Sequence, residues 1–65
     1  MITLYTIDCP KCKVLKQKID NKNINYNIVN DLDIMTNLGM KTAPMLEVNG
    51  LLLNFNEALK WVNEQ

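Results

Sequence analysis

Cys9-Pro10-Lys11-Cys12 lies between two segments of different character in this sequence. An apolar run, Ile2-Thr3-Leu4-Tyr5-Thr6-Ile7, precedes it, and an amphipathic run from Lys13 to Asp20 follows it. The first run predicts a strand over residues 2–7, and the second predicts a helix. The two cysteines are the only ones in the chain, and their spacing lets the sulfurs meet across a single turn. A Cys-x-x-Cys between a strand and a helix is typical of a redox motif.

The length and composition indicate one small globular domain, residues 1–65. A chain this short buries only about 60% of the surface that its unfolded form exposes, so its stability should be small. No apolar run approaches the roughly 20 residues that span a bilayer. Met1-Ile2 leads straight into a strand pattern rather than into a signal peptide. We therefore expect no membrane association and a cytoplasmic location.

Charge and residue usage argue against several classes of function. Seven lysines balance seven acidic residues, and the chain has neither Arg nor His. A net charge of zero gives no electrostatic reason to expect a nucleic acid or an anionic membrane as a partner. Without histidine, a single chain can form neither a Cys-His pair nor a Cys2His2 zinc site. In a reducing compartment, two cysteines are more often catalytic, metal-binding or inert than a permanent crosslink.

The first half of the chain predicts a strand, a helix and a second strand. Cys12, Leu15 and Ile19 form one apolar stripe on a helix whose other faces are mostly lysine. Pro10 suits the first helical turn, where a missing N–H costs nothing. Residues 24–29 alternate apolar and polar side chains, which predicts the second strand. Because a helix joins the two strands, they should be parallel, in a right-handed βαβ unit.

A short second helix should follow. Asn30 or Asp31 can cap its start, and Gly39 is a natural stop because glycine readily takes the left-handed conformation that closes a helix. Its apolar positions are Leu32, Ile34, Met35 and Leu38.

The last third of the chain predicts a hairpin and a final helix. Asn49-Gly50 separates the apolar runs 45–48 and 51–53, and this dipeptide is a strong hairpin signal. Asn54 with Glu57 three residues later matches a capping box, so a helix should begin at the next residue, Phe55. The order is therefore β-α-β-α-β-β-α. It predicts an α/β fold with a mixed four-stranded sheet and helices on both faces.

This chain resembles the thioredoxin fold in three ways: its element order, the Cys-x-x-Cys after the first strand, and the proline before the third strand. Within that fold it is most similar to the glutaredoxins and glutaredoxin-like redoxins, as a member of minimal length. Tyr5-Thr6 ahead of the two cysteines resembles the family's strand-to-active-site segment, and Thr42-Ala43-Pro44 resembles its Thr-Val-Pro segment, whose proline is cis. The glycine pair with which the family commonly holds glutathione has no counterpart in residues 53–57.

Cys9 is the expected nucleophile and Cys12 the expected resolving thiol, because disulfide exchange needs an attacking thiolate and a second thiol that resolves the mixed disulfide. Cys9 stands at a helix start, where unpaired backbone N–H groups favour negative charge. Thiols in such settings have pKa values of roughly 3.5–7.5, against about 8.5 for a free thiol. Asp8 opposes this effect, so we expect moderate activation of Cys9. Cys12, on the buried stripe, should keep a higher pKa.

The resemblance implies a substrate-binding set around the cysteines: Tyr5, Pro10, Lys11, Thr42, Ala43 and Pro44. A cis Pro44 would lie against the Cys9 sulfur and present the backbone of Ala43 to an extended substrate. Lys11 can attract an anionic partner, such as a glutathione carboxylate, or it can be an ordinary solvated lysine. Tyr5 is equally suited to packing within the sheet and to forming the wall of a groove.

The sequence therefore predicts an enzyme, a glutaredoxin-like dithiol–disulfide oxidoreductase that reduces protein or small-molecule disulfides. It should bind no metal and no tightly held cofactor, cycle through a Cys9–Cys12 disulfide, and act as a monomer on a disulfide-containing protein. Its reductant should be glutathione or a thioredoxin-reductase-type flavoenzyme. Two other interpretations stay open at this point. One is a metal or iron–sulfur carrier that uses the Cys-x-x-Cys of two chains, and the other is a non-catalytic interaction module.

Overall fold

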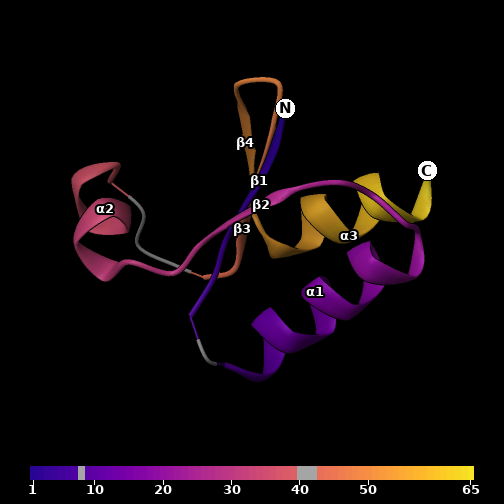
Figure 1. Cartoon of the computed structure of the whole chain (residues 1–65), viewed down its shortest axis with the longest axis horizontal. Coiled ribbons are helices and arrows are strands. Elements are labelled where there is room, and N and C mark those ends of the chain that lie inside the picture. Colours follow the sequence, from indigo (N-terminus) through magenta and orange to yellow (C-terminus); the bar gives the residue numbers. More distant parts are fainter. Residues whose placement is uncertain (8, 40–42) are drawn as a thin grey trace.

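A four-stranded mixed sheet organises the computed structural model, which describes residues 1–7, 9–39 and 43–65. The elements are β1 (Ile2–Tyr5), α1 (Pro10–Asn21), β2 (Asn27–Val29), α2 (Leu32–Asn37), β3 (Met45–Val48), β4 (Leu51–Leu53) and α3 (Phe55–Asn63). The spatial order of the strands is β2-β1-β3-β4. β1 and β2 are parallel, whereas β3 is antiparallel to both β1 and β4. The predicted element order and the mixed sheet are confirmed (Figure 1).

Two helices, α1 and α3, cover one face of the sheet and enclose the core. The core side chains come from β1, β3, β4 and these two helices, and they are Leu4, Leu15, Ile19, Leu46, Leu53, Ala58 and Val62. At about 25 cal/mol per Å² of apolar surface, their burial is the main favourable contribution to folding in a chain of this size. The packing of α1 on this face sets the direction in which its first turn, and hence the Cys-x-x-Cys, projects from the sheet.

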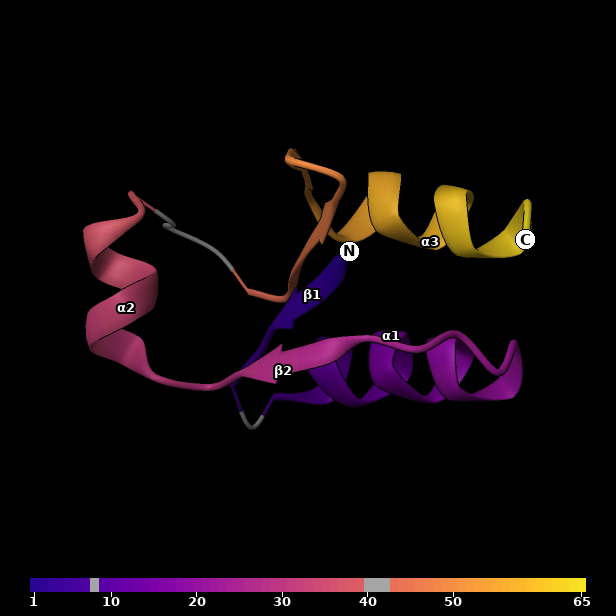
Figure 2. The ribbon, with the colours of Figure 1, turned by 45° about the horizontal axis from the view of Figure 1, so that its top comes forward.

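The second helix stands apart from α1 and α3, beyond the end of the sheet at which β1 and β2 finish (Figure 2). Asp31 caps it by accepting hydrogen bonds from the N–H groups of Asp33 (2.9 Å) and Ile34 (3.4 Å). Gly39, with φ of +78°, follows its end as predicted. Met35 is buried, but the other apolar side chains of this segment, Leu32, Ile34 and Leu38, are between 47% and 63% exposed.

Both N-terminal strands are shorter than predicted. β1 covers Ile2–Tyr5 rather than 2–7, and β2 covers Asn27–Val29 rather than 24–29. The register pairs Thr3 with Asn27, so residues 24 and 25 have no partner in β1, which begins at Ile2. The alternating pattern of this segment still has a structural role, because its two large side chains, Ile24 and Tyr26, pack against the core.

The local signals of the C-terminal third are confirmed. Asn49 (φ 51°) and Gly50 (φ 87°) form the hairpin turn with positive φ at both positions. At the start of α3, the Asn54 side chain accepts the N–H of Glu57 (2.8 Å), and the Glu57 carboxylate accepts the N–H of Asn54 (3.0 Å). In the described part of the chain, no helix is both long enough and apolar enough to cross a membrane.

Candidate active site

Cys9 is the N-cap of α1. Its backbone is extended (φ −136°, ψ 159°), Pro10 follows in the first helical turn, and the Cys9 C=O accepts the N–H of Lys13 at 3.0 Å. The Cys9 sulfur accepts a hydrogen bond from the N–H of Cys12 at 3.2 Å. This N–H is one of the first four of the helix, which have no partner within the helix itself. The sulfur therefore occupies the position in which a serine or aspartate oxygen normally caps a helix.

Cys12 lies one turn into α1 and is only 2% exposed. It forms a disulfide with Cys9, with the two Cα atoms 5.1 Å apart. The Cys12 sulfur also accepts the N–H of Ile7 at 3.4 Å, so the segment after β1 reaches back to the buried sulfur. The two sulfurs differ in access: Cys9 is half-buried, whereas Cys12 is almost fully enclosed.

Each sulfur thus has a backbone N–H donor. When the disulfide is reduced, a donated hydrogen bond favours a thiolate over a thiol, and the start of a helix adds a partial positive charge at Cys9. The Cys9 sulfur is the more accessible of the two, so it is the one that external disulfides can reach. The geometry therefore suits attack by Cys9 and internal exchange with Cys12.

A polar hollow of about 270 Å³ opens beside the start of α1. Its walls come from three segments that are distant in sequence, and they are Lys11, Ala43, Pro44, Asn54, Phe55 and Asn56. The Ala43–Pro44 peptide bond is cis, as predicted, and the Pro44 side chain is fully buried. The structure thus brings three residues of the predicted binding set together: Lys11, Ala43 and Pro44.

The start of α3 forms the other wall of this hollow. Lys11 holds its ammonium 5.6 Å from the centre of the Phe55 ring, in a cation–π contact. The sequence analysis found in residues 53–57 no counterpart of the glycine pair with which the resembled family holds glutathione. The structure shows instead that their amide side chains, from Asn54 and Asn56, line the hollow. The sequence pattern carried no signal for this placement.

Tyr5 is buried in β1, and its hydroxyl donates a 2.9 Å hydrogen bond to the carboxylate of Glu47 on β3. This hydrogen bond, together with burial and the negative charge of Glu47, raises the pKa of the Tyr5 phenol. Tyr5 is not among the residues that line the hollow beside Pro44. Its observed contacts are those of a residue that ties two strands together.

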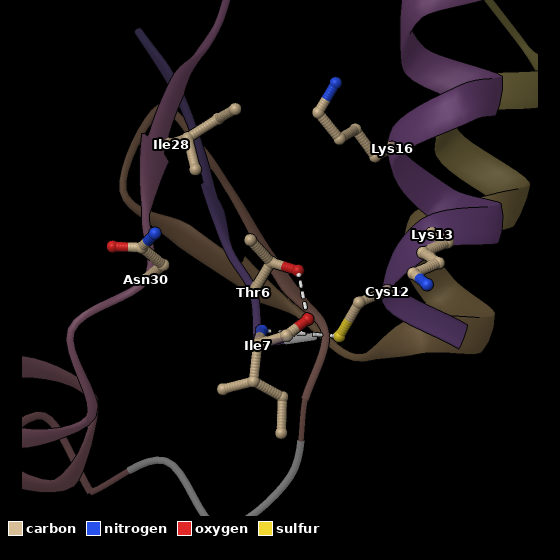
Figure 3. Close-up of a pocket in the computed structure, with 7 residues that line it drawn as sticks. All are labelled: Thr6, Ile7, Cys12, Lys13, Lys16, Ile28 and Asn30. Carbon is tan, nitrogen blue, oxygen red and sulfur yellow. Dashed lines mark hydrogen bonds between the residues drawn. The ribbon is translucent and has the colours of Figure 1, made fainter. Parts of the chain in front are cut away.

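A second hollow, of about 320 Å³, adjoins the buried Cys12 sulfur. Its lining residues, drawn in Figure 3, are Thr6, Ile7, Cys12, Lys13, Lys16, Ile28 and Asn30. They come from the segment after β1, from α1, and from β2 and the residue that follows it. Sequence reasoning did not identify this hollow, because the pairing of β2 with β1 and the packing of α1 together create it.

The remaining candidates are placed as follows. Pro10 is exposed at the first position of α1. Thr42 and Asp8 lie outside the described residues. Within residues 1–7, 9–39 and 43–65, no three or more Cys, Asp or Glu side chains gather in a group that could hold a metal ion.

Comparison with known proteins supports the fold. No protein-family model and no curated protein matches the chain. A solved structure of a diazinon-metabolizing glutathione S-transferase from the silkworm Bombyx mori matches all of this chain with a TM-score of 0.79 and 18% identity. The chain spans only 37% of that protein.

A second solved structure is similar in size. A mutant form of the thioredoxin-like protein BC3987 matches 97% of this chain with a TM-score of 0.76 and 20% identity, and the match covers 99% of that protein. At such identities the likeness is one of fold. Together with the strand order, the cis Pro44 and the Cys-x-x-Cys at the start of α1, it identifies this chain as a thioredoxin-fold protein.

Proposed function

We propose that the protein is a glutaredoxin-like thiol–disulfide oxidoreductase that reduces disulfides through Cys9 and Cys12. The observation that carries the proposal is the asymmetry of the pair. A half-buried Cys9 caps α1 and accepts an N–H, and it is bonded to a Cys12 that is 2% exposed. Thiol–disulfide exchange needs this division between an accessible attacking thiolate and a sheltered resolving thiol.

The cycle begins with both cysteines reduced. The Cys9 thiolate attacks one sulfur of the substrate disulfide, and the other substrate sulfur leaves as a thiolate that takes a proton from solvent. Cys12 then gives up its proton and attacks the Cys9 sulfur, which breaks the mixed disulfide and releases the second substrate thiolate, and this thiolate also takes a proton from solvent. The substrate has gained two electrons and two protons, and the protein holds the Cys9–Cys12 disulfide. An external thiol or dithiol must return the two electrons.

We place the substrate in the hollow beside Pro44. Its walls offer backbone at Ala43, a cation at Lys11 and two amide side chains, a set that suits an extended peptide or a small anionic thiol. Pro10 and Thr42 belong to the proposed binding set because they flank Cys9 and Ala43 in the sequence. Tyr5 is proposed to act at a distance, by holding β1 against β3.

For the reductant we propose glutathione, whose carboxylates the Lys11 ammonium would attract. The amides of Asn54 and Asn56 would serve in place of the glycine pair that the chain lacks. The test supplies the oxidised protein with either glutathione, or thioredoxin reductase and NADPH, and counts free thiols. Recovery of two thiols per chain with glutathione supports this choice, whereas recovery only with the flavoenzyme refutes it.

The decisive experiment for the reaction compares two single variants in a disulfide-reduction assay. Cys9→Ser should lose activity, because Cys12 is too enclosed to attack an external disulfide. Cys12→Ser should attack once and then remain in a mixed disulfide with the substrate, which mass spectrometry detects as an added mass that dithiothreitol removes. Full activity of Cys9→Ser would falsify the mechanism.

A further inference from the structure

One edge of the sheet is open at β2, whose Ile28 lines the same hollow as Cys12. β2 is the outermost strand in the order β2-β1-β3-β4, and within the described residues no strand lies beyond it. The N–H of Thr6 donates to the C=O of Val29 at 3.0 Å, so Val29 faces β1. Successive residues of a strand direct their backbone groups to opposite sides. The N–H and C=O of Ile28 therefore point away from the sheet, where another strand could bind them.

The side chains around this edge are apolar and accessible. Ile28 is 49% exposed and Ile7 is 38% exposed, and both line the hollow of about 320 Å³ that adjoins the Cys12 sulfur. In Figure 3, Ile28 projects from β2 on the side that faces α1. Exposed apolar side chains beside an unpaired strand edge are a feature of surfaces that accept an added strand.

The opposite wall of the hollow is basic. Five of the seven lysines lie between residues 11 and 22, and Asp20 is the single acid in that stretch. Two of these lysines, Lys13 and Lys16, line the hollow. Lys16 forms an exposed ion pair with Asp20 at 3.0 Å. Although the chain has no net charge, this helix therefore carries a local positive potential next to the disulfide.

Two acids lie next in sequence to residues that line the hollow, and one of them, Asp8 after Ile7, lies outside the described residues. Asp31 follows Asn30 directly, but its carboxylate is already engaged with the N–H groups that begin α2. Exposed Asp33 follows two residues later. The carboxylates of Asp20 and Asp31 are thus engaged within the chain, and the α1 wall of the hollow carries lysines.

We propose that a partner protein docks here through an extended, acidic segment that adds as a strand to β2. Its backbone would pair with the outward N–H and C=O of Ile28. Its apolar side chains would enter the hollow against Ile7 and Ile28, and its carboxylates would face Lys13 and Lys16. The inference rests on the proposed function in one respect: the docked protein is the disulfide substrate, held beside the sulfur pair by a surface separate from the hollow at Pro44.

The test uses the oxidised, ¹⁵N-labelled full chain and two short synthetic peptides without cysteine, one alternating Glu with Val and the other alternating Lys with Val. Amide shifts are followed by NMR at low salt. We expect the acidic peptide to shift the amides of Ile28 and of the first two turns of α1, and to bind at least about 5-fold more tightly than the basic one. Added salt should weaken its binding.

Variants of the edge strand separate strand addition from simple charge attraction. Ile28→Pro removes the outward N–H without touching the hydrogen bonds of Val29 to β1, and it should weaken binding of the acidic peptide by about 10-fold. Ile28→Val keeps the N–H and should bind as the parent does. If the proline variant does not fold, Ile28→Ser serves instead, because it removes the apolar side chain from the hollow without adding a charge that attracts the peptide. Lys16→Gln should weaken binding by about 2-fold, whereas Lys18→Gln, on the same helix but outside the hollow, should not.

Three results would overturn the proposal. The first is equal binding of the two peptides, the second is shifts confined to the hollow at Pro44, and the third is full binding by Ile28→Pro or Ile28→Ser. Shifts at Ile28 that depend on protein concentration without peptide would show that a second copy of the chain is the occupant, which also refutes it. Turnover of a small disulfide by the parent protein is measured separately. If turnover is present without peptide binding, this inference fails alone; if binding is present without turnover, the proposed function fails alone.

Discussion

Replacing Asn54 with alanine tests how α3 supports the candidate site. Asn54 caps α3, with its side chain accepting the Glu57 N–H at 2.8 Å, and it also lines the hollow that contains Lys11 and Pro44. Alanine removes this acceptor but leaves the Asn54 backbone N–H, which the Glu57 carboxylate accepts. The change therefore removes one half of the capping box and exposes one backbone donor of the first turn to solvent.

The free energy of unfolding should fall by about 1 kcal/mol, since removal of an N-cap side chain generally costs about 0.5–2 kcal/mol. For 65 residues, the unfolding entropy near 60 °C is about 0.14 kcal/mol/K, so 1 kcal/mol lowers Tm by about 7 °C. This is a substantial share of the stability of so small a domain. The loss should also loosen Phe55, the first residue of the helix, against which Lys11 rests.

Thermal unfolding followed by circular dichroism measures the change, with two controls. Asn54→Asp keeps a capping oxygen and should hold Tm within about 2 °C of the parent, while its added negative charge should slow reaction with the anionic glutathione disulfide. Asn56→Ala changes a second exposed amide of the hollow without removing the cap, and Tm should not fall. If Asn54→Ala unfolds at the parent temperature, or if Asn56→Ala destabilises as much, the cap does not support the start of α3.

Two further predictions concern the sheet. The Tyr5 phenol has a raised pKa when folded, so its hydrogen bond to Glu47 stabilises the fold fully below the unfolded pKa of about 10 and is lost as pH rises through the folded value. In urea unfolding, the stability difference between the parent and Tyr5→Phe should therefore be constant up to about pH 9 and shrink above pH 10; a difference that stays constant to pH 11.5 contradicts this. Leu46 is fully buried in β3. Leu46→Ala should therefore lower the free energy of unfolding by about 2–5 kcal/mol and leave much of the protein unfolded at 37 °C. Leu51→Ala, at a side chain that is 64% exposed, should change stability by less than about 0.5 kcal/mol, and an equal loss in both variants would show that Leu46 is not in the core.

The element order was predictable because each element carries its own short-range signal. Three such signals are the N-cap at Asn54, the turn at Asn49-Gly50 and the helix stop at Gly39, and all three are confirmed. Each of them depends only on residues within about four positions of itself. The two cysteines belong to this class as well. Their separation of three residues at a helix start places both sulfurs in one turn whatever the rest of the chain does.

The lengths of the N-terminal strands could not be predicted in this way. The alternation over residues 24–29 describes which side chains turn inward, and Ile24 and Tyr26 do pack against the core. Whether the backbone is also hydrogen-bonded depends on the register with β1, which pairs Thr3 with Asn27. Register is a property of two segments, so the pattern of one segment cannot report it.

Local sequence signals predict the order of the elements, the caps and turns that bound them, and the dithiol at the start of α1. These follow from interactions within a few residues, whose geometry the backbone dictates. Other features depend on the tertiary structure. Tyr5 forms a hydrogen bond with Glu47, 42 positions away, and Lys11 forms a cation–π contact with Phe55. A basic hollow lies between β2 and α1 beside Cys12. Such contacts form when packing of the shared core brings distant segments together, and no spacing along the chain encodes them.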